Sequence, residues 1–96
     1  MNIEVGKFYA TDHMEGDIKE TNIILVLPNK ENTPDFQIRT ETMYLVNDEV
    51  NSLDENNWIP QCLKREATEK EIQVFQQQRN DLGDLQSYSA VVSGGE

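Results

Sequence analysis

Five consecutive aliphatic residues, Ile23 to Leu27, constrain the fold of this chain more than any other feature. An unbroken aliphatic run of this length favours a strand that is buried on both faces. Pro28 ends the strand, because proline has no backbone N–H to donate to a sheet ladder. We therefore place residues 23–27 at the centre of a β-sheet.

Further strand patterns lie on both sides of this run. Residues 3–10 form a short apolar stretch, which we interpret as a first strand with a bend or bulge at Gly6. Residues 36–46 alternate with a period of two, which predicts one long strand or two strands joined by a bend near residues 40–42. Glu15-Gly16-Asp17 is a turn sequence, and residues 58–63 around Pro60 suit a short edge strand or extended segment.

One helix is predicted late in the chain, at about residues 69–82. Thr68 followed three residues later by Glu71 is a capping box at its N-terminus. One helical face then carries a narrow stripe made of Ile72, Phe75, Arg79 and Leu82. Gly83 is expected to end the helix as the C′ residue. The segment 84–92 could supply one more strand, through the alternating residues Tyr88, Ala90 and Val92.

These elements predict an α+β fold. We expect a twisted, mainly antiparallel sheet of four or five strands, either open or curled into a small open barrel, because the connections are too short for parallel crossovers. Residues 1–92 would form a single small domain, and residues 93–96 a mobile tail.

The charge balance is strongly acidic. Eight Lys and Arg residues face eighteen Asp and Glu residues, which gives a formal net charge of -10. Such a field repels phosphates and anionic membranes, so we expect neither direct nucleic-acid binding nor membrane binding. The densest site is the segment 47–57, which holds four acids and no base and which we expect to be a solvated connection after the strand 36–46. The plain alternative is that the acids only keep the protein soluble.

Cysteine usage and hydropathy favour a cytoplasmic protein, in the host cytoplasm if the protein is viral. Cys62 is the only cysteine, so an internal disulfide is impossible. The N-terminal residues lack the apolar core of a secretory signal, and no apolar run reaches the ~18 residues of a membrane span.

No catalytic or metal-binding constellation is evident, so we expect no enzyme activity and no cofactor. A calcium loop starting at Asp48 would need glycine at its sixth position and glutamate at its twelfth, where the chain has Leu53 and Ile59. A catalytic Cys–His pair could be formed only by Cys62 and His13, the single cysteine and the single histidine of the chain. Cys62 is expected to fill core volume and His13 to lie exposed in a loop.

The function we predict is therefore binding to a basic protein surface, such as the nucleic-acid site of another protein. Spaced carboxylates can replace phosphates as partners for Arg and Lys. The small size and acidity resemble many bacteriophage accessory proteins, which suggests an inhibitor of a host defence or nucleic-acid enzyme. No residue pattern carries that resemblance. The predicted partner-binding residues are Asp48, Glu49, Asp54, Glu55, Trp58, Asp12, Glu15, Asp17 and Glu20.

Two other classes of function stay open. An adaptor or assembly subunit would bind a partner through a sheet edge or through the free face of the helix, where Gln73, Gln76, Gln77 and Asn80 lie. A small enzyme of unrecognised type is the weakest reading. Trp58, as the only tryptophan, is either an aromatic anchor for a partner or a core residue. The sequence does not fix an oligomeric state.

Overall fold

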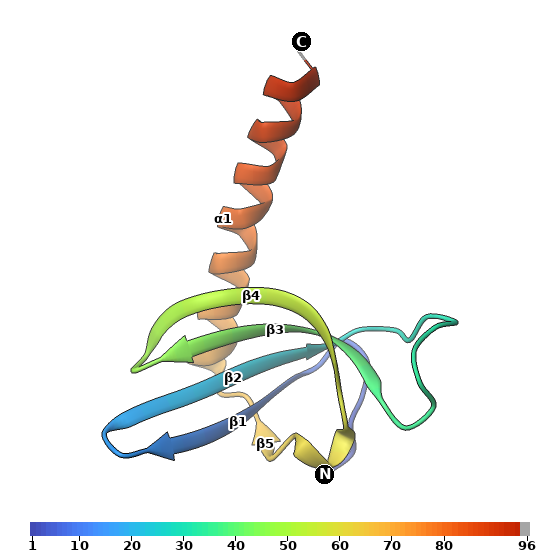
Figure 1. The fold of residues 1–96 in the computed structure, drawn as a ribbon, viewed down its shortest axis with the longest axis vertical. Helices are drawn as coiled ribbons and strands as arrows, with labels where there is room; N and C mark the ends of the chain where they lie inside the picture. The colour runs from blue at the N-terminus through green and yellow to red at the C-terminus, as the bar shows by residue number, and fades with distance from the viewer. Residues whose placement is uncertain (95–96) are drawn as a thin grey trace.

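The computed structural model describes residues 1–94, with side chains up to Asp81. Its elements follow one another as β1 (Phe8–Glu15), β2 (Ile18–Val26), β3 (Ile38–Val46), β4 (Glu49–Trp58), the 3-10 turn η1 (Pro60–Cys62), β5 (Arg65–Glu66) and α1 (Glu69–Gly94). Figure 1 shows one curved sheet with the helix crossing its far side. The prediction of an α+β fold with one late helix is confirmed.

The sheet has five strands in the order β4-β3-β2-β1-β5, and every pairing is antiparallel. The aliphatic run 23–27 therefore lies in a central strand, as its composition predicts. Because β4 and β5 are separate edges, the sheet is open and is not closed into a barrel. Residues 38–46 form one strand without a bend.

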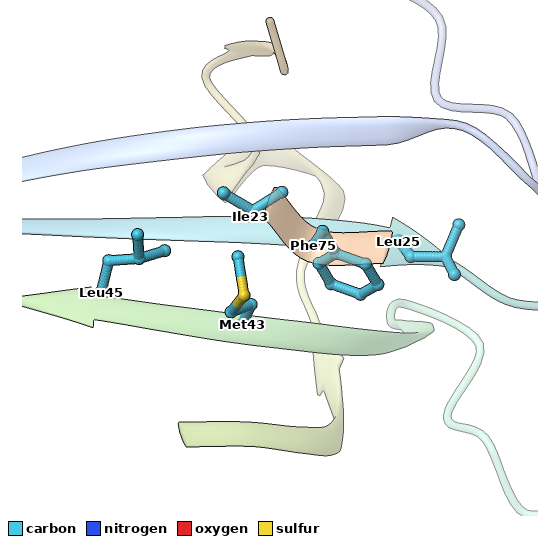
Figure 2. Close-up of a cluster of buried hydrophobic side chains, with 5 residues drawn as sticks. All are labelled: Ile23, Leu25, Met43, Leu45 and Phe75. Carbon is cyan, nitrogen blue, oxygen red and sulfur yellow. The ribbon is translucent and has the colours of Figure 1, made fainter. Parts of the chain in front are cut away.

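Alternation divides the side chains of β2 and β3 between the two faces of the sheet. On the helix-covered face, Ile23, Leu25, Met43 and Leu45 surround Phe75, whose side chain is fully buried. Figure 2 shows that these four side chains come from both strands and lie around Phe75. Phe75 also meets Phe8 edge to face, with ring centroids 5.2 Å apart. One aromatic side chain thus holds the helix against the centre of the sheet.

The opposite face has its own apolar cluster, made of Tyr9, Ile24, Val26 and Leu63, with Ile3, Ile38 and Trp58 packed against it. The N-terminal segment is fastened there, because the Tyr9 hydroxyl donates to the Asn2 carbonyl (3.0 Å) and accepts from the Glu4 N–H (2.8 Å). The central strand is therefore buried on both faces. The aliphatic run needs both clusters to remove its two faces from water.

The start of the helix is fixed by the predicted capping box. The Glu71 N–H donates to Thr68 Oγ1 (3.1 Å), and the Thr68 N–H donates to Glu71 Oε1 (2.8 Å). Arg65 joins this cap to the sheet. Its guanidinium reaches Glu71 at 2.7 Å and Asp12 at 2.9 Å. The helix therefore begins anchored at the β5 edge.

Several sequence-based boundaries are wrong. The first strand begins at Phe8 rather than at residue 3, because a turn at residues 5–6 with Gly6 at φ 86° separates the preceding segment. The helix continues past Gly83 to Gly94, so it does not end at a C′ glycine and residues 84–92 are not a strand. A glycine inside a helix costs only about 1 kcal/mol. The predicted mobile tail lies partly at residues 95–96, outside the described residues.

Candidate protein-binding surface

The acidic segment 47–57 is a β-strand and not the solvated connection that its composition suggests. Asn47 and Asp48 form a two-residue turn, and β4 begins at Glu49. Both turn residues have positive φ, 50° and 66°, as a type I′ hairpin requires. Asn and Asp tolerate this left-handed conformation better than other non-glycine residues. The segment therefore folds back along β3 and becomes the outer strand of the sheet.

A β-bulge interrupts the register of this hairpin. Tyr44 pairs with Ser52 and Leu45 pairs with Val50, so Asn51 is the extra residue on β4. Beyond the bulge the side chains of β4 alternate regularly between the faces. Asp54 lies opposite Thr42 on the face without the helix, whereas Glu55 lies opposite Glu41 on the helix side. The two central carboxylates therefore point to different faces of the sheet.

The two acidic stretches of the sequence meet at one end of the sheet. The Asn47 N–H donates to the Lys19 carbonyl (2.8 Å), and the Lys19 N–H donates to Asn47 Oδ1 (2.9 Å). These bonds hold the β1–β2 and β3–β4 hairpin tips side by side, as Figure 1 shows at the end of the sheet away from the chain's N-terminus. We call the carboxylates of these tips the acidic end; they are Glu15, Asp17, Glu20, Asp48 and Glu49.

Ion pairs separate the predicted binding residues into two groups. Asp12, Asp48 and Glu55 each bind a base, namely Arg65, Lys19 and Arg39 in that order. A further set has no ion-pair partner among the side chains up to residue 81: Glu15, Asp17, Glu20, Glu49 and Asp54. The exposed members of this set keep their full capacity for a basic partner, whereas Glu20 is half-buried and shares a hydrogen bond with Tyr44.

Hydrogen bonds from Arg and Thr side chains shift several pKa values. The guanidinium of Arg65 lowers the pKa of Asp12 through its hydrogen bond and its charge, helped by the Thr21 hydroxyl. The guanidinium of Arg39 lowers the pKa of Glu55 in the same way. On the face without the helix, a hydrogen bond with Glu20 raises the pKa of the Tyr44 phenol, and burial and the charge of Glu20 add to the rise. The lowered pKa values keep Asp12 and Glu55 ionised at neutral pH.

Trp58 is a half-buried structural residue at the far end of β4. Its Nε1–H donates to Thr42 Oγ1 (2.9 Å), and its ring packs against the Tyr9–Leu63 cluster. Asn56 Oδ1 accepts from the Thr40 and Thr42 hydroxyls at 2.8 and 2.9 Å. These bonds satisfy two hydroxyls that are almost fully buried. The tryptophan is therefore committed to the fold and lies apart from the acidic end.

A shallow polar hollow of about 340 Å³ opens beside β4, between this strand and the loop after β2. Its lining includes Lys30, Arg39 and Glu55, and Glu55 binds Arg39 and lies 3.9 Å from Lys30. The charges inside the hollow are therefore largely matched by each other. Sequence reasoning did not single out Arg39, although its place in the alternating strand 36–46 gave a signal that it would meet a neighbouring strand.

The two nucleophile candidates occupy different places from those expected. Cys62 is exposed at the end of η1, so the prediction that it fills core volume is wrong, and the neighbouring Leu63 takes that role. His13 is exposed as expected but lies on β1 rather than in a loop. Among the described residues, no group of three or more His, Cys, Asp or Glu side chains is placed to hold a metal ion. No described helix is long and apolar enough to cross a membrane.

Comparison with known proteins gives no relative. No protein-family model matches the chain, and neither does any curated protein or solved structure. The function of this surface is therefore argued from its own charges and geometry.

Proposed function

We propose that this protein is a non-enzymatic, acidic protein-binding module that blocks a basic surface of a partner. The observation that carries the proposal is the meeting of two acidic hairpin tips, distant in sequence, at one end of the sheet. Carboxylates spread over a rigid sheet present a pre-organised set of acceptors to Arg and Lys. The partner surface would be one that normally binds nucleic-acid phosphates.

The proposed biological role is inhibition. A basic groove that is occupied by this protein is closed to nucleic acid, because both ligands compete for the same guanidinium and ammonium groups. If the chain comes from a bacteriophage, as its size and acidity suggest, the target would be a host defence or nucleic-acid enzyme. Binding would be fast and salt-sensitive, because a net charge of -10 steers association with a basic partner.

The test combines capture with charge removal. Tagged protein is used to capture partners from a nuclease-treated lysate of its own host, with washes at low and high salt. We expect a nucleic-acid-binding protein that is lost at high salt and displaced by added DNA or RNA. The test variant removes the four acids of the segment 47–57 by the changes Asp48→Asn, Glu49→Gln, Asp54→Asn and Glu55→Gln.

A matched variant controls for net charge. It neutralises four exposed acids elsewhere, by the changes Glu31→Gln, Asp35→Asn, Glu66→Gln and Glu69→Gln. We expect the test variant to bind the captured partner at least about tenfold more weakly, and the control variant to bind it like the original protein. Unaltered binding by the test variant would sink the proposal. A partner that resists high salt would instead favour an adaptor that binds through the sheet edge or the helix.

A further inference from the structure

The outer side of β4 is an open sheet edge. β4 ends the strand order, and within residues 1–94 no strand pairs with its outer side. It is ten residues long and contains no proline and no lysine, two of the devices that stop an edge from pairing. Its bulge at Asn51 lies near its start, so residues 52–58 keep a regular edge. The other edge, β5, is only two residues long. A long free edge is a template for one more strand.

The register identifies which backbone groups face outward. The Arg39 carbonyl accepts from the Leu27 N–H (2.9 Å), so the backbone of Arg39 points toward β2. The N–H and C=O of a residue in an antiparallel strand point to the same side, and this side alternates along the chain. Thr40 therefore points toward β4 and bonds Asn56, its partner in the register.

The same alternation fixes β4 between its bulge and its end. The backbone groups of β4 residues that pair with even-numbered positions of β3 bond to β3. The backbone groups of those that pair with odd-numbered positions point away from the sheet. The outward residues are Leu53, Glu55 and Asn57. Each presents one N–H and one C=O to solvent, so an added strand would find three donors and three acceptors in regular spacing.

Charge decides what kind of strand fits this edge. β4 carries Glu49, Asp54 and Glu55 and no base. A second copy of β4 would set acids against acids, which disfavours pairing between two copies of this chain. A basic extended segment would instead meet opposite charges directly across the edge.

The faces of β4 specify the pattern of that segment. Asp54 and Glu55 are adjacent in sequence and point to opposite faces, so two consecutive basic residues would place one cation on each face. Leu53 shares the helix face with Glu55 and is half-buried against the apolar cluster there. An apolar residue beside the basic pair would extend this cluster.

We propose that β4 binds a partner by strand addition, and that the partner contributes an extended segment with two consecutive basic residues next to an apolar one. The inference rests on the proposed function, because it names how the basic partner is held. Backbone hydrogen bonds to Leu53, Glu55 and Asn57 give the added strand its register. Asp54, which has no ion-pair partner among the side chains up to residue 81, selects its charge, and Glu55 accepts the second base beside Arg39.

The first test measures amide hydrogen exchange with a synthetic probe. The probe is a ten-residue peptide of alternating threonine and valine, with arginine and lysine as its two central residues. We expect slower exchange at the amides of Leu53, Glu55 and Asn57 when the peptide binds, and unchanged exchange at the inward amides of Asp54 and Asn56. A peptide with two central glutamates is the control and should give no protection. Binding of the basic peptide without protection at the three outward amides would overturn the proposal.

The second test removes one outward donor. Asn57→Pro deletes an outward N–H without changing charge, and Asn57→Ala keeps that N–H as the matched control. We expect Asn57→Pro to weaken peptide binding about fivefold, the net effect of one lost hydrogen bond, and Asn57→Ala to change it little. Thermal unfolding of both variants checks that β4 is retained. Equal affinity of the two folded variants would count against strand addition.

The two proposals fail in different ways. If the partner is still lost at high salt and on neutralising the four acids, but no outward amide is protected, blocking of a basic surface stands and strand addition is wrong. If the neutralised variant binds its partner normally, the acidic module itself is wrong.

Discussion

The two edges of the sheet are built in opposite ways. The β5 edge is two residues long, is followed at once by the helix, and is held by Arg65 bound to Asp12 and Glu71. The β4 edge is ten residues long and has a ladder on one side only. A short covered edge cannot recruit another strand, whereas a long open one can. The acids of β4 and the bulge at Asn51 are the features that oppose pairing between two copies of this strand.

The comparison also separates stability from binding. The contacts that hold the helix and the N-terminal segment lie mainly on β1, β2, β3 and β5, whereas β4 contributes half-buried and exposed side chains. We therefore expect changes near β5 and Phe75 to alter the free energy of unfolding, and changes along β4 to alter partner binding. The following predictions test this division, from the largest expected effect to the smallest.

The largest effect is expected where the helix is fixed to the sheet. Phe75→Ala would remove the only fully buried side chain of the described helix and leave a cavity between β2 and β3, at a cost of about 3–4 kcal/mol. Leu53→Ala, on half-buried β4, should cost about 1 kcal/mol. Urea unfolding followed by Trp58 fluorescence measures both. Similar costs for the two variants would contradict the division between the edges.

The next effect compares the ion pairs at the two edges. Arg65→Gln breaks bonds to two carboxylates, one of them in the helix cap, and we expect a loss of about 1–2 kcal/mol. Arg39→Gln breaks one ion pair with the exposed Glu55 and one hydrogen bond to the Pro28 carbonyl, neither of them in the helix cap, and should cost less. The same urea experiment at low and high salt decides the order. A larger loss for Arg39→Gln would reverse the comparison.

The next prediction concerns acid, which should lower the free energy of unfolding through the two carboxylates that bind Arg65. The pKa values of Asp12 and Glu71 lie below their ordinary values of 3.8 and 4.5, because both carboxylates accept from Arg65. Depressed carboxyl pKa values add stability that is fully present above the ordinary values and is lost as the pH falls through the folded-state values. The free energy of unfolding should thus fall below about pH 4.5.

The Arg65→Gln variant provides the control for this acid response, because it removes the largest cause of the lowered pKa values of Asp12 and Glu71. Its free energy of unfolding, measured in urea between pH 7 and pH 3, should fall less steeply than that of the original protein. Parallel curves would show that other carboxylates carry the acid sensitivity.

The smallest effect is expected at the turn that leads into β4. Asp48→Gly replaces a residue at φ 66° by the one that adopts this conformation most easily, and it creates the preferred Asn-Gly turn. We expect a gain of about 0.5 kcal/mol, reduced by loss of the exposed pair with Lys19. Gly16→Ala at φ 61°, in the other hairpin, should instead lose about 1 kcal/mol. Thermal unfolding compares them, and a loss in Asp48→Gly would refute the turn argument.

Local signals explain which parts of the fold the sequence predicts. The central strand, the alternation of 38–46, the Gly16-Asp17 turn and the Thr68–Glu71 cap each depend on neighbouring residues only. β4 is not predicted from the sequence, for two physical reasons. Asn, Asp and Glu have low strand propensity, and the bulge at Asn51 breaks the period of two between Val50 and Leu53.

The candidate surface depends on information that single segments do not hold. The composition alone singles out the acids of both hairpins, but their meeting requires the pairing of β2 with β3, in which Glu20 lies opposite Val46. The separation of Asp54 from Glu55 onto different faces likewise requires the register after the bulge. The sequence left Trp58 as either a partner-binding anchor or a core residue, and its hydrogen bond to Thr42 shows that the fold itself uses it.

The order of the strands also has a consequence for how the chain folds. β1 to β4 form a meander in which each strand pairs with its sequence neighbour, so these ladders close short loops and can form within microseconds to milliseconds. The Arg65–Asp12 contact spans 53 positions and must close a far longer loop. During synthesis the residues of the meander emerge before Arg65 and the helix, so we expect β1 to β4 to pair first and the helix to dock onto them afterwards.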